Sequence, residues 1–283
     1  MLGRGNKEDK VENYLPFLIE YFISKQKIAL CLPIFLITNL KKTYMKKVIL
    51  IGAIVFLSTH LNAQISFGVQ VGGNLANVKI SDTESGTTTK QNTKVKFGFL
   101  VGVVAEIPIA SSLSFRPELN FIQKGFKVDQ TLSESGATIV STGNETSNFI
   151  EVPLNVVYNL SVGNGKVFFG IGPSIGYGIS GKFSSLTTTT FPGEPTEIQS
   201  DNGNVKFDGK KAADISSGDK DTHLKALDFG GNILAGYKMS NGLYLNAGYT
   251  LGFSNLNPNA KTSFKTNGLT IKVGFMFGGN KDN

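Results

Sequence analysis

Eight stretches in which apolar and polar residues alternate constrain the fold of this chain more than any other feature. Successive residues of a strand point to opposite faces, so each stretch predicts a strand with one apolar and one polar face. Each is about ten residues long or more, the length that a tilted strand needs to cross a bilayer. The stretches are 65–76, 94–107, 113–127, 148–160, 166–180, 223–238, 243–255 and 264–278.

The connections between these stretches alternate in length. Three are short and lie at 110–112, 162–165 and 240–242. Two of them hold Asn-Gly pairs, which favour tight turns. Three are long and polar and lie at 77–93, 128–147 and 181–222. Short turns at one rim and long loops at the other are typical of outer-membrane barrels. The sequence therefore predicts an all-β fold, an eight-stranded antiparallel up-and-down transmembrane β-barrel over residues 64–279.

Side-chain volume indicates which face points inward. The interior of an eight-stranded barrel is only just wide enough to be filled by side chains. The apolar faces carry Phe, Tyr, Ile, Leu and Val nearly throughout, whereas the opposite faces carry much glycine, as at Gly170, Gly172, Gly176 and Gly178. The bulky set would overfill the interior. We therefore expect small and polar residues inside, and an apolar band that faces lipid, where a closed ring leaves no backbone group unpaired.

The first 63 residues read as a leader. Met45-Lys46-Lys47 precedes an apolar run at 48–59, which is the layout of a secretory signal peptide at 45–63 with cleavage after Ala63. We interpret residues 1–44 as an upstream extension or a misassigned start, with translation beginning at Met45. The alternative is an inner-membrane hairpin that tethers the protein. Residues 280–283 form a C-terminal tail.

Charge and cysteine content exclude several functions. The net charge of +7 suggests nucleic-acid binding, but nine Lys/Arg against four Asp/Glu place +5 of it in residues 1–63. The remainder has no basic stripe and no recognition motif, so we expect no nucleic-acid partner. Cys31, the single cysteine, also lies in the leader, which leaves no thiol for a disulfide, a zinc site or a nucleophile beyond it.

Charged residues recur on the faces that we expect to point inward. They are Glu106, Arg116, Glu118, Glu151, Asp228 and Lys272. Amides lie between them, at Gln70, Asn74, Asn120, Asn155, Asn232 and Asn246. Buried charges must pair, since each unpaired one costs several kcal/mol. We expect a structural network that plugs the lumen, with Arg116 at its centre and Glu151 facing it. The alternative is a polar conduit or a small-ligand site.

No residue pattern indicates catalysis, a metal or a cofactor. His223 follows Asp219 and Asp221, with Ser216 and Ser217 nearby, but nothing fixes a nucleophile or an orienting partner, so we expect a solvated loop histidine. Five loop acids lack the spacing of a calcium loop, namely Asp201, Asp208, Asp214, Asp219 and Asp221.

Four segments resemble the PorT-like outer-membrane β-barrel proteins of Gram-negative bacteria. They are Arg116-Pro117-Glu118-Leu119-Asn120-Phe121, 149–160, 170–181 and 228–256. The resemblance covers essentially all of 64–279 and implies an outer-membrane barrel, usually without a known ligand. It also implies that some relatives serve a protein-secretion system. The chain departs from such proteins at its end, where six residues follow Phe277.

These observations together predict a non-enzymatic protein of the outer membrane that needs no cofactor. We expect it to contact outer-membrane lipid and to anchor long surface loops for interaction or envelope structure. Its largest loop, 181–222, would meet an extracellular or secretion-system partner. The alternatives are a narrow channel or small-molecule transporter, an accessory component of a secretion system, and a membrane-embedded hydrolase that uses His223.

Overall fold

The computed structural model describes residues 65–84, 87–134 and 136–278. The predicted segment 1–44, the predicted signal peptide and the tail lie outside these residues. Within the described ranges the chain forms strands and one 3₁₀ turn, η1 (Ala212–Asp214). No helix among the described residues is long and apolar enough to cross a membrane.

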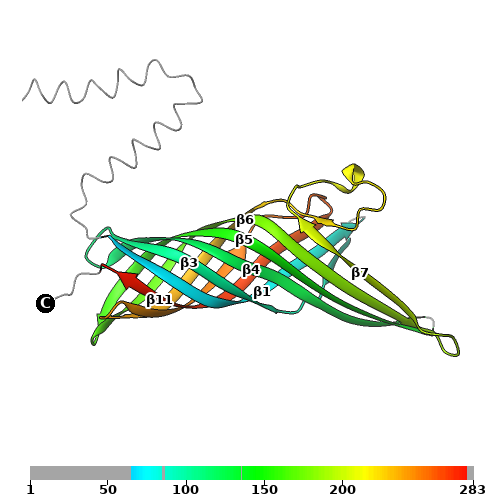
Figure 1. Ribbon diagram of the computed structural model, residues 1–283, viewed down its shortest axis with the longest axis horizontal. Coiled ribbons are helices and arrows are strands. Elements are labelled where there is room, and N and C mark those ends of the chain that lie inside the picture. The colour runs from blue at the N-terminus through cyan, green and yellow to red at the C-terminus, as the bar shows by residue number, and fades with distance from the viewer. Residues whose placement is uncertain (1–64, 85–86, 135, 279–283) are drawn as a thin grey trace, which may run out of the picture. The chain divides into compact units, whose positions relative to one another are not determined.

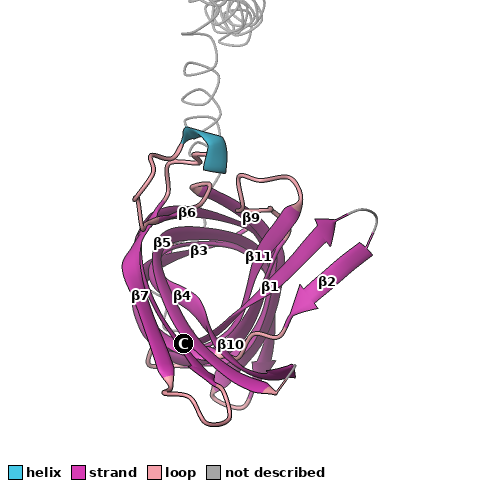
Figure 2. Ribbon diagram, turned by 90° about the vertical axis from the view of Figure 1, so that its right-hand side faces the viewer, coloured by secondary structure: helices cyan, strands magenta, loops and turns pink. Residues whose placement is uncertain are grey.

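Eight strands close into a ring, in which each strand is antiparallel to its two neighbours (Figures 1 and 2). In ring order they are β1 (Ser66–Glu84), β3 (Lys96–Pro108), β4 (Leu113–Glu134), β5 (Ala137–Val162), β6 (Gly165–Thr190), β9 (Leu227–Met239), β10 (Leu243–Gly252) and β11 (Thr262–Phe277). Pairing of β11 with β1 closes the ring. The predicted all-β, eight-stranded up-and-down barrel is confirmed.

The apolar faces of the strands point outward. On β10, Leu245 is 55% exposed while its neighbour Tyr244 is 1% exposed. The same contrast recurs around the ring, and Ile171 reaches 66%. A continuous band of such side chains would be poorly placed in water, whereas hydrocarbon accommodates it and tolerates a closed barrel, because every backbone group is paired. The band therefore marks the membrane-spanning part of the barrel.

Aromatic residues lie at both ends of the apolar band. We call the end near the short turns the lower end and the opposite end the upper end. The lower girdle lies near the short turns and consists of Phe67, Phe115, Tyr158, Phe169, Tyr237, Phe275 and Phe277. The upper girdle consists of Phe97, Phe99, Phe121, Tyr177, Phe229 and Phe253. Aliphatic residues such as Val71, Val101 and Ile233 lie between them. Aromatic residues favour the two membrane–water interfaces, so the girdles mark the limits of the hydrocarbon.

The three long polar connections are largely strands, which corrects the prediction of loops at 77–93, 128–147 and 181–222. β1 continues to Glu84 and pairs with β2 (Thr87–Gln91). β4 continues to Glu134, and β5 begins at Ala137 and pairs with it. β6 continues to Thr190 and pairs with β7 (Glu197–Lys206), which β8 (Thr222–His223) joins in parallel. Many of the added residues are Thr, Val or Ile, which suit strands.

Four of these strand segments form one sheet that continues beyond the ring (Figure 1). We call this sheet the extension; it comprises 128–134 of β4, 137–147 of β5, 181–190 of β6, and β7. Its base packs on the apolar core at the upper end of the barrel, through Phe126 and Phe183.

Glu145 lies buried at the base of the extension. In the strand register it pairs with Phe126 on one side and Phe183 on the other. Burial raises the pKa of Glu145 to about 7, although a hydrogen bond from the Ser147 hydroxyl and the charge of Lys96 both act to lower it. At neutral pH the base of the extension therefore holds a carboxyl group that is only partly ionised.

This shift predicts that the protein loses stability as the pH rises. The folded protein binds the Glu145 proton more tightly than the unfolded chain, so its contribution is full below about pH 4.5 and is lost through about pH 7. We expect a loss of about 3 kcal/mol between pH 5 and pH 8.5. Glu145→Gln should remove most of that loss in unfolding experiments, and Glu197→Gln, at an exposed acid, should not. An identical pH dependence of wild type and Glu145→Gln would contradict the assignment.

Candidate functional site

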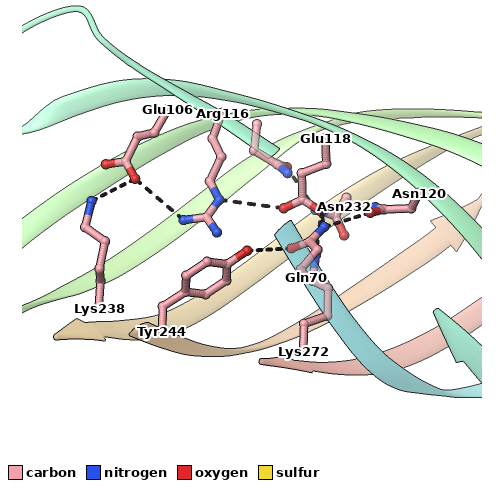
Figure 3. Close-up of polar contacts among 10 residues, drawn as sticks. Gln70, Glu106, Arg116, Glu118, Asn120, Asn232, Lys238, Tyr244 and Lys272 are labelled. Carbon is pink, nitrogen blue, oxygen red and sulfur yellow. Dashed lines mark hydrogen bonds and ion pairs between the residues drawn. The ribbon is translucent and has the colours of Figure 1, made fainter. Parts of the chain in front are cut away.

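All six charged residues that the sequence places inward lie in the lumen, and none is more than 6% exposed. They are Glu106, Arg116, Glu118, Glu151, Asp228 and Lys272. Alternation explains their common direction, because each belongs to the series on its strand that opposes the lipid-facing band. Figure 3 shows the part of this network around Arg116.

Arg116 occupies the lower centre of the network and is fully buried. Its Nη1 lies 3.8 Å from Glu106 Oε2, and its Nε lies 3.7 Å from Glu118 Oε1 (Figure 3). The guanidinium carbon is 4.8 Å from the ring centroid of Phe168 and 4.6 Å from that of Tyr244. Two carboxylates and two aromatic faces thus hold the cation, which an apolar interior would otherwise disfavour.

Glu118 collects more partners than any other carboxylate of the network. Its Oε2 lies 2.6 Å from Lys272 Nζ and accepts hydrogen bonds from Gln70 Nε2 at 2.8 Å and Asn120 Nδ2 at 3.1 Å. Gln70 also donates to Asn120 Oδ1 at 2.7 Å and accepts from Tyr244 Oη at 2.9 Å (Figure 3). These contacts fix side chains from four strands, β1, β4, β10 and β11, so the network ties opposite walls of the barrel together.

A second centre lies higher in the lumen around Lys124. Its Nζ is 2.6 Å from Glu151 Oε2 and 3.2 Å from Asp228 Oδ2, and it lies 5.0 Å from the ring centroid of Phe149. Thr266 Oγ1 donates to Asp228 Oδ2 at 2.6 Å. This centre again joins distant strands, because its members come from β4, β5, β9 and β11.

The prediction that Glu151 faces Arg116 is wrong. In the register Arg116 pairs with Asn155, and Glu151 lies four residues away, opposite Asn120. Glu151 pairs with Lys124 instead. Lys124 was not among the predicted lumen residues, although Lys124 continues the inward series of Arg116 on β4.

Among the described residues, ion pairs in the lumen join four cations to four carboxylates. The cations are Arg116, Lys124, Lys238 and Lys272, and the carboxylates are Glu106, Glu118, Glu151 and Asp228. Lys238, also overlooked in the sequence, lies 2.8 Å from Glu106 Oε2. It shares the inward series of Asp228 and Asn232, so strand parity alone could have identified it.

Two apolar clusters share the lumen with the network, so the lumen is less polar than predicted. The upper cluster consists of Val78, Ile80, Leu100, Ile122, Phe149, Val205, Leu224, Leu256 and Phe264. The lower cluster consists of Val104, Val157, Phe168, Leu234, Tyr244 and Met276. Glycine makes room for them: a Cβ at Gly178 would lie 2.2 Å from the ring of Phe207, which stacks edge-on with Phe149.

His223 is buried, which corrects the prediction of a solvated histidine. Its Nδ1 lies 2.8 Å from Asp208 Oδ1, and its Nε2 lies 3.4 Å from Asp219 Oδ2. In the described part of the chain neither Ser216 nor Ser217 makes a hydrogen bond to it, so no nucleophile stands beside the imidazole. The two aspartates instead tie the strand at His223 to the loop that precedes it.

Asp221 makes contacts within the same segment. Lys206 Nζ lies 2.6 Å from Asp221 Oδ2, and Asp221 Oδ1 accepts a hydrogen bond from the Asn204 backbone. Across the described ranges, no group of three or more His, Cys, Asp or Glu side chains could hold a metal ion.

A closed antiparallel ring, an outward apolar band between aromatic girdles and an ion-paired lumen define an outer-membrane β-barrel. Comparison of sequences agrees with this class. The chain belongs to the family of the outer membrane protein beta-barrel domain, whose family model matches residues 61–257. Its location is therefore the outer membrane, where lipid surrounds the barrel. No curated protein sequence matches the chain.

Solved structures of outer-membrane proteins are similar at low identity. Ail of Yersinia pestis, in complex with the heparin analogue sucrose octasulfate, is 12% identical, with 76% of this chain and 99% of that chain covered and a TM-score of 0.31. OprG of Pseudomonas aeruginosa is 14% identical, with 77% and 98% covered and a TM-score of 0.39. Neisserial surface protein A is 16% identical, with 75% and 97% covered and a TM-score of 0.29. At these scores the likenesses carry no argument about function.

The geometry around Arg116 predicts a large loss of stability when its charge is removed. In Arg116→Ala two buried carboxylates lose a partner, which should lower the free energy of unfolding by about 3–5 kcal/mol. Melting and heat-modified gel mobility measure this loss, and Lys211→Ala, in the loop between β7 and β8, serves as control. Wild-type melting and mobility of Arg116→Ala would show that the guanidinium does not hold the network together.

Proposed function

We propose that this protein is a non-enzymatic outer-membrane anchor whose extension binds a protein partner outside the membrane. The observation that carries the proposal is the extension itself, a sheet that continues beyond the upper aromatic girdle with two unpaired edges. The short turns lie at the opposite rim, which in outer-membrane barrels is the periplasmic one. The extension therefore lies on the extracellular side.

The edges of the extension offer backbone groups to a partner. Residues 128–134 of β4 pair with β5 alone among the described strands. On its free side, β7 pairs with β8 only at Val205 and Lys206. Unpaired strand edges are templates for strand addition, unless charge or proline guards them. Leu132 and Ile198, 59% and 68% exposed, add apolar contacts at these two edges.

The filled lumen favours an anchor over the alternative of a narrow channel or transporter. Ion pairs span the interior, and two apolar clusters fill the space around them. A solute would have to displace these side chains, and each broken buried pair costs several kcal/mol. The extension also includes part of the segment 181–222, to which the sequence assigned a partner.

We further propose that the chain lies within the PorT-like group of its family, on the residues of 149–160 and 228–256. A partner from a protein-secretion system would then dock on the extension, and the protein would act as an accessory component of that system. An envelope-structural role would use the same edges with a different partner.

Site-specific photo-cross-linking on intact cells tests the proposal. A photo-reactive residue at Leu132 or Ile198 should give a discrete adduct with one protein. The same residue at Phe191, which is also exposed, at 44%, but lies in the turn between β6 and β7, should give much less. The absence of any adduct at both edges would contradict a partner there.

A further inference from the structure

We propose that a belt of lysines just above the upper aromatic girdle binds the anionic, phosphate-bearing headgroups of outer-leaflet lipid. The lysine belt consists of Lys79, Lys127, Lys182, Lys225 and Lys265, all exposed. This binding surface is independent of the edges of the extension.

Strand alternation places Lys79 and Lys265 of the lysine belt on the lipid-facing surface. On β1, Lys79 continues the outward series of Val71 and Leu75. On β11, Lys265 continues that of Leu269 and Ile271. Lysine can lay its aliphatic stem along apolar surface and raise its ammonium group to the interface. The ammonium groups therefore lie at the depth where lipid headgroups begin.

The lysine belt lacks counter-ions within the protein. Lys79 and Lys265 are directly opposite each other in the register. Like charges opposite each other on one face destabilise a sheet unless an anion lies between them. Within the described ranges none of the five lysines makes an ion pair, and Asp129, an exposed acid at this level, is engaged by Lys94 at 2.7 Å. The pair at Lys79 and Lys265 thus calls for an external anion.

The opposite rim carries no such belt. Among the described residues near the short turns, the lysines are Lys166 and Lys238, and neither is fully exposed. Lys238 turns inward to Glu106. Within the described residues, the exposed lysines next to the band therefore lie on its extracellular side, so they match the outer leaflet. Basic residues next to the hydrocarbon attract anionic headgroups over about a Debye length.

A hollow on the same surface favours lipid over free phosphate. Its volume is about 840 Å³. Its lining includes Asn148, Tyr177, Ile179, Ser180 and Lys182, and also Lys206 of β7 and Asp208, whose carboxylate is engaged by His223. Tyr177 and Ile179, 55% and 50% exposed, offer apolar contact for an acyl chain. Asn148 Nδ2 donates to Ser180 Oγ at 3.1 Å, so polar groups lie directly beside them. An apolar side next to amides and a lysine fits an amphiphile.

Lipid binding to the full chain in nonionic detergent tests the proposal. Native mass spectrometry counts adducts of phosphatidylglycerol and of zwitterionic phosphatidylcholine. The variants are Lys79→Gln/Lys265→Gln and Lys127→Gln/Lys182→Gln, and the control with the same change in charge is Lys211→Gln/Lys220→Gln, in the loop between β7 and β8. Heat-modifiable gel mobility shows that each variant folds.

We expect wild type and control to bind phosphatidylglycerol with equal affinity, and each belt variant to bind it roughly tenfold or more weakly. Phosphatidylcholine binding should be the same in all four proteins. Inorganic phosphate at the concentration of the lipid should not displace phosphatidylglycerol. Equal affinity of the belt variants and wild type would overturn the proposal. Displacement by inorganic phosphate would overturn the assignment to lipid.

Discussion

The requirement that every backbone polar group be paired inside hydrocarbon governs this structure. A sheet satisfies it only by closing, and the pairing of β11 with β1 supplies the closure. In a closed ring, alternate side chains of each strand point to lipid and to the interior. One face of each strand must therefore suit lipid, and the other must fill a narrow interior. The girdles, the lysine belt and the lumen network are consequences of the two faces that alternation creates.

Charged side chains fill much of the barrel interior. An eight-stranded ring encloses enough space for side chains and little more. Arg116 fills its part of that space between Phe168 and Tyr244, and Lys124 does so beside Phe149. Lys124 draws Asp228 from β9, and Glu118 draws Lys272 from β11, so these ion pairs link strands that share no backbone hydrogen bond. Burial makes such pairs costly to break, and this favours one register for the whole barrel.

The sequence was sufficient for the ring because period-two alternation is a local signal that survives around the whole barrel. It also identified Glu118 and Lys272 as inward residues, since parity fixes direction. Strand parity does not show which inward residues pair with each other. The pairing of Glu151 with Lys124, for example, depends on the register between strands, which is set by the tilt of every strand. The extension was missed because Thr- and Ser-rich strands in water have two polar faces and lose the alternating pattern. The burial of His223 depends on that same segment, so it too was not predictable.

The most direct test of the account is which face of the strands meets lipid. The chain has no tryptophan, so a single Phe→Trp substitution gives an unambiguous fluorescent probe. Phe99 points outward at 47% exposure, and Phe168 points into the lumen. In vesicles of bromine-labelled phosphatidylcholine, Phe99→Trp should be strongly quenched and Phe168→Trp only weakly. Quenching of Phe168→Trp with Phe99→Trp unaffected would mean that the barrel is inside out.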